Sequence, residues 1–209
     1  MSKEYTCLGM MSGTSGDGVD ASIIQSDGLD KFAILKEKYY EYDEALFRDY
    51  HDLKNKINSS NDLKKYFSSI QKLENTITIF HAKVVQDIIK SFDIDLIGFH
   101  GQTIYHNPQE KISLQLGNGS LLSQLTKKKI VFNFRQNDIN NGGEGAPLTP
   151  IFHKYLIKSK KIELPACMLN IGGISNLTLI HNLSNHKITS QDVGPGNCLI
   201  NAWIQNHTN

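Results

Sequence analysis

The sequence predicts a mixed α/β protein made of two related lobes, and three observations support this. Short stretches rich in β-branched and aromatic residues alternate with longer stretches whose apolar residues recur at three- and four-residue steps. The order strand, glycine-rich turn, strand, strand occurs at the N-terminus and begins again near residue 165. A polar, glycine-rich loop at residues 140–147 lies between the two occurrences. We therefore expect a first lobe at residues 1–147 and a second lobe at residues 148–209.

The first lobe opens with three predicted strands, at residues 5–11, 19–25 and 32–39, whose tight turns are typical of an antiparallel meander. Residues 43–57 are charged and predict a helix. Residues 62–90 carry one apolar stripe after a candidate N-cap, Asn61, and predict a core-packing helix with at most one break. The other elements expected here are strands at 95–99, 112–116 and 129–132 and a helix at 120–125.

The second lobe is expected to begin with a helix at residues 149–160. Strands at 166–171, 175–180 and 187–189 follow, and Gly172-Gly173 forms the first turn between them. A helix at residues 198–204 closes the pattern.

The composition is that of an ordinary soluble globular protein, with 39% hydrophobic and 21% charged residues among 209. A net charge of +1 gives no electrostatic reason to expect nucleic acid or an anionic membrane as a partner. No apolar run approaches the roughly 20 residues that span a bilayer, and no signal peptide opens the chain, so we expect a cytoplasmic protein. Cys7, Cys167 and Cys198 are scattered and lack zinc-ligand spacing, which favours buried apolar roles.

The first turn, GMMSGTSGDGVD at residues 9–20, is the strongest candidate for a binding site. Glycines between two strands expose backbone N–H groups to a ligand's oxygens. Asp17 and Asp20 add carboxylates that can hold Mg²⁺ through water. A plain hairpin is the alternative, because Asp17-Gly18 suits a tight turn without any ligand.

A second polar cluster, His100-Gly101-Gln102-Thr103, is expected directly after a strand end, where α/β sheets place ligands. His106 is either a similar pocket residue or a turn residue. Arg135 precedes the loop at residues 140–147 and suits a carboxylate or phosphate, or else a surface salt bridge. The loop itself is either a flexible linker or a ligand-contacting loop.

In the second lobe, Asp192 is followed by Gly-Pro-Gly at a predicted helix start. There a carboxylate and free N–H groups can meet an anionic ligand.

Together, the motifs GMMSGTSGDGVDA, FHGQTIYHNP, FRQNDINNGGEGAPLTP, NIGGISNLT and DVGPGN resemble, in identity and order, the anhydro-N-acetylmuramic acid kinase family of peptidoglycan recycling. The resemblance implies an actin-like (ribonuclease H-like) two-lobed fold with ATP in the cleft. Family members are longer than this chain, which resembles their N-terminal portion with an incomplete second lobe. Their reaction opens the 1,6-anhydro bond of 1,6-anhydro-N-acetylmuramic acid with water. It also phosphorylates O6, giving N-acetylmuramic acid 6-phosphate.

The resemblance also implies roles for individual residues, with ATP and Mg²⁺ as cofactors. Asp192 matches the general base, and Asp17 is the candidate metal ligand. The implied phosphate-binding residues are Gly13, Thr14, Ser15, Gly16, Asp17, Gly18, Val19, Asp20, Gly172 and Gly173, and the implied sugar-binding residues are His100, Thr103, Arg135 and Asn176.

Four positions depart from the family pattern. Gly16 replaces a bulkier apolar residue and is expected to loosen the loop, Asn118 and Asn133 replace expected aspartates, and Glu144 replaces a glutamine.

Two other readings stay open at this point. One is a truncated, non-catalytic sugar-binding remnant of the family. The other is an actin-like ATPase module, against which the sugar-contacting segments argue. The resemblance leaves a homodimer open.

Overall fold

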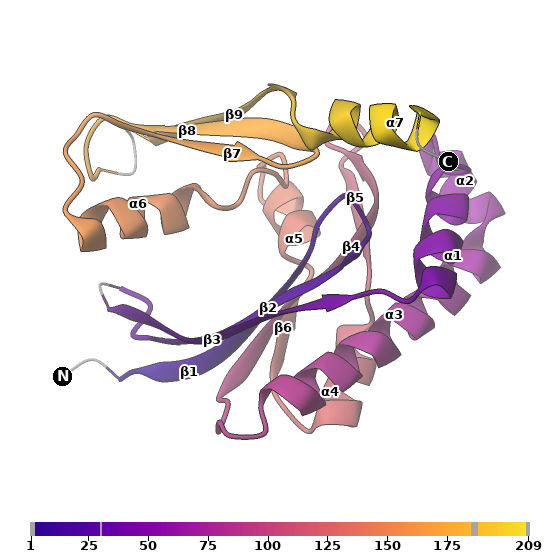
Figure 1. The fold of residues 1–209 in the computed structure, drawn as a ribbon, viewed down its shortest axis with the longest axis horizontal. Helices are drawn as coiled ribbons and strands as arrows, with labels where there is room; N and C mark the ends of the chain where they lie inside the picture. Colours follow the sequence, from indigo (N-terminus) through magenta and orange to yellow (C-terminus); the bar gives the residue numbers. More distant parts are fainter. Residues whose placement is uncertain (1–2, 30, 185–187, 208–209) are drawn as a thin grey trace. The chain divides into compact units, whose positions relative to one another are not determined.

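The computed structural model describes residues 3–29, 31–184 and 188–207, and it divides the chain into two compact units, Met1–Gly145 (unit 1) and Ala146–Asn209 (unit 2). Within these described residues each unit has its own sheet, with six strands in unit 1 and three in unit 2, and both sheets are flanked by helices (Figure 1). The predicted α/β class is therefore confirmed. Among the described residues, no helix combines the length and the apolar character needed to cross a membrane.

The sheet of unit 1 is built around the predicted meander, which is confirmed. Strands β1 (Tyr5–Ser12), β2 (Gly18–Ser26) and β3 (Phe32–Glu41) pair in antiparallel fashion. On its other side β1 pairs in parallel with β4, and the order is β3-β2-β1-β4-β5, with β6 also paired to β4. The later strands are β4 (Leu96–Asn107), β5 (Ile112–Leu116) and β6 (Ile130–Phe132).

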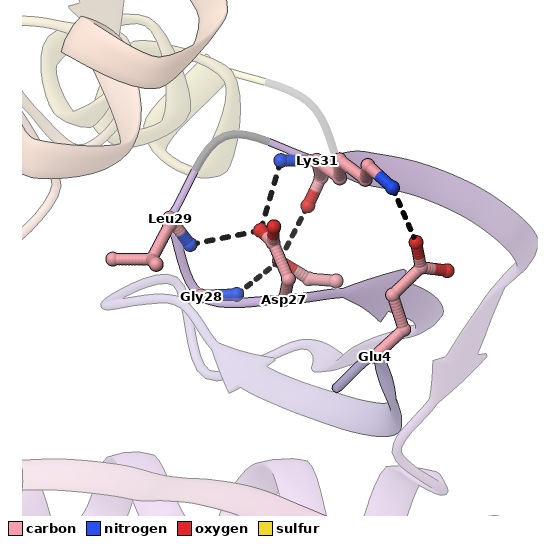
Figure 2. Close-up of polar contacts among 6 residues, drawn as sticks. Glu4, Asp27, Gly28, Leu29 and Lys31 are labelled. Atoms are coloured by element: carbon pink, nitrogen blue, oxygen red, sulfur yellow. Dashed lines mark hydrogen bonds and ion pairs between the residues drawn. The ribbon is translucent and has the colours of Figure 1, made fainter. Parts of the chain in front are cut away.

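The turn between β2 and β3 is closed by side chains, as Figure 2 shows. Asp27 Oδ1 accepts hydrogen bonds from the N–H groups of Leu29 at 3.0 Å and Lys31 at 2.9 Å. Ser26 Oγ accepts from the Gly28 N–H at 3.0 Å and donates to the Lys31 carbonyl at 2.7 Å. The side chains of Ser26 and Asp27 thus bond the backbone groups that have no cross-strand partner in this turn. This is the physical reason why Ser-Asp-Gly predicts a turn.

The long predicted helix is in two pieces. A short helix α2 (Ser60–Lys65) and a long helix α3 (Phe67–Ile88) meet at Tyr66. The N-cap is Ser59 and not Asn61, because Ser59 forms a capping box with Asp62. The other helices of unit 1 are α1 (Glu44–Lys54), α4 (Gly119–Thr126) and α5 (Phe134–Asn140), of which α5 was not predicted.

The core of unit 1 lies between its sheet and α3. Leu73, Ile77 and Ile88 from the apolar stripe of α3 are buried in one cluster with sheet residues such as Leu8 and Phe99. The stripe that predicted a packing helix therefore packs as expected.

Unit 2 consists of an antiparallel sheet in the order β7-β8-β9, with α6 against β8 and β9. Its elements are α6 (Pro150–Lys160), β7 (Ala166–Ile171), β8 (Ile174–Ile180), β9 (Ile188–Pro195) and α7 (Asn197–His207). The strand predicted at 187–189 begins at a position outside the described residues, and β9 continues well beyond it, to Pro195.

The prediction of buried cysteines is wrong. Cys7 and Cys198 are half-buried, and Cys167 is exposed. Cys167 lies on β7, an edge strand of the small sheet whose Leu169 and Ile171 are exposed as well.

Candidate functional site

The candidate phosphate loop, residues 13–17, joins β1 to β2 and is closed by a hydrogen bond from the Gly16 N–H to the Gly13 carbonyl at 3.2 Å. Gly16 has φ +64°, and a Cβ there would lie 2.1 Å from Cε1 of Tyr50. Tyr50 is fully buried, and its hydroxyl donates to the Thr103 carbonyl at 2.8 Å. The expectation that Gly16 loosens the loop is therefore wrong, because the Tyr50 ring fills the space that a larger residue would take.

The carbonyl oxygens of alternate residues in this loop are all held by donors from elsewhere in unit 1. Each donor comes from a different segment: β4, α1 and the chain after β3. The three bonds are Gln102 Nε2 to the Gly13 carbonyl at 2.7 Å, His51 Nε2 to the Ser15 carbonyl at 2.9 Å, and the Tyr42 N–H to the Asp17 carbonyl at 2.8 Å.

The N–H groups of Thr14 and Ser15 behave differently. In the part of the chain that the structure describes, neither donates a hydrogen bond. The protein therefore engages the loop carbonyls of residues 13, 15 and 17, while the N–H groups of Thr14 and Ser15 stay available to a ligand. This polarity suits an anion, which a plain hairpin does not require.

A buried polar network lies beneath the loop. Tyr42 Oη is 3.3 Å from both Ser12 Oγ and Gln102 Oε1, and Ser12 Oγ is 3.3 Å from His81 Nε2. His81 Nδ1 lies 2.8 Å from the Ile77 carbonyl on α3. Burial lowers the pKa of His81 to about 4, so the ring is neutral at physiological pH.

Asp17 in the loop and Asp20 on the following strand β2 supply the two carboxylates of this segment. Ser15 Oγ donates to Asp17 Oδ1 at 2.7 Å. Burial, and then the charge of Asp17, raise the pKa of Asp20. Among the described residues no group of three or more His, Cys, Asp or Glu side chains could hold a metal ion. Two neighbouring carboxylates still fit Mg²⁺, which completes its coordination with water and phosphate oxygens.

The cluster at residues 100–103 lies within β4, so the prediction that it follows a strand end is wrong. Gly101 has φ +73°, and the register between β1 and β4 shifts here, so the strand absorbs the glycine as a bulge and continues. Thr103 is buried, and its hydroxyl accepts from Gln115 Nε2 at 3.3 Å. His106 Nδ1 lies 2.9 Å from Ser113 Oγ on β5, which makes His106 a sheet residue and not a turn residue.

His100 and Arg135 are brought together, although they are distant in sequence. Arg135 Nε on α5 donates to His100 Nε2 at 2.9 Å, and His100 Nδ1 therefore carries the proton and donates to the Gly101 carbonyl at 2.7 Å. Burial and the Arg135 charge lower the pKa of His100 to about 4. Ser12 and Gln102 are register partners, so His100 lies on the strand that pairs with β1 just before the candidate phosphate loop.

The structure explains two of the family departures. Asn118 is the N-cap of α4, and its Oδ1 accepts from the Leu121 N–H at 2.9 Å, a role that Asp fills equally well. Asn133 precedes α5 with φ +63°, a conformation that Asn and Asp adopt more readily than other residues. Glu144 is exposed, and nothing in the structure explains that exchange.

Hydrogen bonds to Asp138 on α5 hold residues 143–145 of the loop that follows this helix. Asp138 Oδ2 accepts from the Gly145 N–H at 2.8 Å, and the Gly143 N–H donates to the Asp138 carbonyl at 2.9 Å. This favours a held loop near Arg135 over a flexible linker.

In unit 2, the Gly172-Gly173 turn is held against the start of α7. The Asn197 N–H donates to the Gly172 carbonyl at 2.7 Å, and the Gly196 N–H donates to the Gly173 carbonyl at 2.9 Å. The Cys198 N–H also reaches the Gly173 carbonyl, at 3.4 Å. The prediction of free N–H groups at this helix start is therefore wrong for residues 196–198.

Asn176 and Asp192 are direct cross-strand partners on β8 and β9, and Asn170 faces Asn176 from β7. Asp192 therefore lies within a strand, five residues before α7, and its side chain is exposed. Asn176 Oδ1 is buried and has no hydrogen-bond partner among the described residues. Asp192, the general base that the resemblance implies, and Asn176, an implied sugar-binding residue, thus face each other on neighbouring strands.

A second polar row lies beside this one. His153 Nδ1 on α6 is 2.8 Å from Thr178 Oγ1, which is 3.1 Å from Ser190 Oγ on β9. Burial lowers the pKa of His153. The row connects α6 to the sheet next to Asn176.

Sequence reasoning missed Tyr42 and His51, which hold the candidate phosphate loop, and His81 in the network beneath it. It placed Gln102 in the polar cluster at residues 100–103 but not as a partner of the loop. His81 offered one signal, because a polar residue stands four positions after Ile77 on an otherwise apolar stripe. His51 and Tyr42 offered none, since their partners are far away in the sequence.

Comparison with known proteins gives consistent matches. A family model described as anhydro-N-acetylmuramic acid kinase matches residues 5–209. The anhydro-N-acetylmuramic acid kinase of Pelagibacter ubique (strain HTCC1062) is 57% identical over 210 residues, covering 100% of this chain and 56% of that protein. That of Agrobacterium fabrum (strain C58) is 36% identical over 215 residues, covering 100% and 57%. The chain thus spans little more than half the length of these relatives.

A crystal structure of an exopolyphosphatase-like protein also aligns with 99% of this chain and 55% of its own. The sequence identity is 11% and the TM-score is 0.48, a likeness too weak to support any conclusion.

Proposed function

This chain belongs to the anhydro-N-acetylmuramic acid kinase family, and on that basis we propose that it carries out part or all of the reaction of such a kinase. The reaction hydrolyses the 1,6-anhydro bond of 1,6-anhydro-N-acetylmuramic acid and transfers the γ-phosphoryl group of ATP to O6. The product is N-acetylmuramic acid 6-phosphate, which is returned to cell-wall metabolism.

The polarity of the loop at residues 13–17 is the observation that carries this proposal. Its carbonyl oxygens at residues 13, 15 and 17 accept hydrogen bonds from the protein, while the N–H groups of Thr14 and Ser15 donate none among the described residues. Phosphoryl transfer depends mainly on positioning and on stabilising phosphate charge. Backbone N–H groups in a fixed loop supply both.

Asp17, with Asp20 beside it, would hold Mg²⁺ through water at this loop. Burial, and then the charge of Asp17, raise the pKa of Asp20, and a bound cation would offset this repulsion. When bound, the ion would neutralise charge on the phosphate oxygens.

Asp192 would act as the general base of ring opening. Its exposed carboxylate takes a proton from water, the water oxygen bonds to the anomeric carbon, and the bond from that carbon to O6 breaks. The electron pair stays on O6, which receives the phosphoryl group, so a second carboxylic acid is not needed. Asn176, its cross-strand partner, would orient the sugar.

The remaining assignments follow the same reasoning. Arg135, held by neutral His100, would contact the sugar together with Thr103, and Gly172 and Gly173 would contribute to phosphate binding. We propose that the two units correspond to the start and the continuation of an actin-like fold. A homodimer and a cytoplasmic location are part of the same proposal.

The test is calorimetric titration of the chain with MgATP and, separately, with 1,6-anhydro-N-acetylmuramic acid, with the Pelagibacter ubique relative as positive control. Binding of both, followed by formation of the 6-phosphate, supports the kinase. Sugar binding without nucleotide binding supports the non-catalytic remnant, and binding of neither overturns the proposal.

A matched pair of variants tests the loop itself. A Cβ at Gly13 would lie 3.5 Å from Ser15 Oγ and one at Gly9 would lie 3.9 Å from the Ser22 carbonyl, so both sites accept alanine without a clash. Gly13→Ala should weaken MgATP binding by narrowing the approach to the loop, and Gly9→Ala should not. Equal affinities in the two variants would contradict phosphate binding here.

A further inference from the structure

The peptide that joins Gly13 to Thr14 is oriented by a buried side chain from another strand. In a trans peptide the carbonyl and the following N–H point in opposite directions. Gln102 Nε2 holds the Gly13 carbonyl at 2.7 Å, a shorter bond than the 3.2 Å bond from the Gly16 N–H. The Thr14 N–H consequently points away from Gln102.

The orientation of the Gln102 amide group is itself determined, because only one arrangement of hydrogens satisfies the network. The Ile77 carbonyl can only accept, so His81 Nδ1 carries the proton of the neutral ring. His81 Nε2 is then an acceptor, and the Ser12 hydroxyl donates to it. With its own hydrogen engaged, Ser12 can only accept from Tyr42.

Tyr42 Oη lies 3.3 Å from both Ser12 Oγ and Gln102 Oε1, so its single hydrogen is shared between these two acceptors. The Gly13 carbonyl can only accept, which places Nε2 of Gln102 toward Gly13 and leaves Oε1 facing the Tyr42 hydroxyl. All four network side chains are nearly solvent-free, with exposed fractions of 0% for Gln102 and His81, 1% for Ser12 and 4% for Tyr42. Water is thus excluded as a competing partner.

We propose that Gln102 is a positioning residue for the phosphate loop. Its amide group, oriented by Tyr42, Ser12 and His81, holds the Gly13 carbonyl inward and so presents the Thr14 N–H to a phosphate oxygen. The phosphate part of this inference rests on the proposed function, whereas the orientation of the peptide does not.

Gln102→Glu is the informative variant, because it keeps the size of the side chain and replaces the donor with an acceptor. Gln136→Glu is the matched control. Gln136 Nε2 also donates to a backbone carbonyl, that of Lys111 at 3.1 Å, but it lies on α5 away from the loop. Tyr42→Phe gives a second test that leaves Gln102 in place and removes only the hydroxyl that orients it.

The first readout is nuclear magnetic resonance of the ligand-free chain. The carbonyl ¹³C resonance of Gly13 and the amide ¹⁵N resonance of Thr14 should move in Gln102→Glu and, to a smaller extent, in Tyr42→Phe, and stay in place in Gln136→Glu. Unchanged Gly13 and Thr14 resonances in folded Gln102→Glu or Tyr42→Phe would overturn the inference, whatever the chain binds.

The second readout is the dissociation constant for MgATP, measured beside the thermal midpoint of each variant. Gln102→Glu should raise the constant by about tenfold, the effect of losing one hydrogen bond to a buried acceptor. Ile77→Val, which removes a buried methylene next to His81 without a polar change, should lower the midpoint and leave affinity intact. If the parent fails to bind MgATP, the proposed function fails, and the resonance test still decides the role of Gln102. If the parent binds and Gln102→Glu binds equally well, the positioning role is wrong.

Discussion

Replacing Gly16 with alanine should destabilise unit 1 strongly. The residue has φ +64°, which costs an ordinary L-residue about 1–2 kcal/mol. The new Cβ would lie 2.1 Å from Cε1 and 2.3 Å from Cδ1 of Tyr50, so the ring must also move. Tyr50 has no exposed surface and its hydroxyl is bonded to the Thr103 carbonyl, and overpacking of this kind costs about 1–3 kcal/mol. The free energy of unfolding should therefore fall by about 2–5 kcal/mol.

The loss in unfolding free energy is measured by equilibrium unfolding in urea, with the near-ultraviolet circular dichroism of the tyrosines as the signal. Gly13→Ala is the control, because its Cβ has an ordinary 3.5 Å contact with Ser15 Oγ. Adding Tyr50→Ala to Gly16→Ala should recover part of the loss caused by the collision, and this coupling isolates the contact. A Gly16→Ala chain as stable as the Gly13→Ala chain would refute the claim that the ring fills this space.

Three further predictions concern the site and its surroundings. Asp192→Asn should abolish formation of the proposed 6-phosphate product and leave the thermal midpoint unchanged, because the side chain is exposed; activity within a few-fold of the parent would refute its role as base. Between pH 6.5 and 4, His81 takes up a proton in the unfolded chain but not in the folded chain. Its burial should therefore make the chain about 2 kcal/mol less stable at pH 5 than at pH 7. His81→Gln should reduce the slope of the unfolding free energy against pH. Asn118→Asp and Asn133→Asp should each change the free energy of unfolding by less than about 0.5 kcal/mol, because aspartate suits both the N-cap and the left-handed position; a larger loss in urea titrations would show that the amide is required.

Local patterns predicted most of the elements correctly. The meander follows from alternating β-branched and aromatic residues between turns, and Ser26-Asp27-Gly28 marks a turn that local hydrogen bonds from Ser26 and Asp27 close. Helix α5 was missed because it begins after a left-handed Asn133 that makes no side-chain cap, so none of the usual start signals is present.

The predictions that failed depend on contacts between distant residues. Gly101 was interpreted as a strand end, whereas pairing with β1 on one side and β5 on the other carries β4 through it. The free N–H groups expected at the start of α7 are engaged by the carbonyls of the Gly172-Gly173 turn, 23 to 25 residues earlier in the sequence. Motifs therefore located the candidate site, while its internal bonds were not predictable from short stretches.

The shift of register between β1 and β4 limits the insertions and deletions that this part of the sequence can accept. Between Met10 and Ser12 of β1, two steps along the strand match three steps on β4, from Phe99 to Gln102. Because side chains alternate along a strand, the extra residue places Gln102 on the face where it meets Ser12. Deleting one residue at this bulge would turn Gln102 to the opposite side of the sheet, even if every motif letter survived. Insertions and deletions in this segment are therefore more damaging than most substitutions, and the number of residues is itself part of the site.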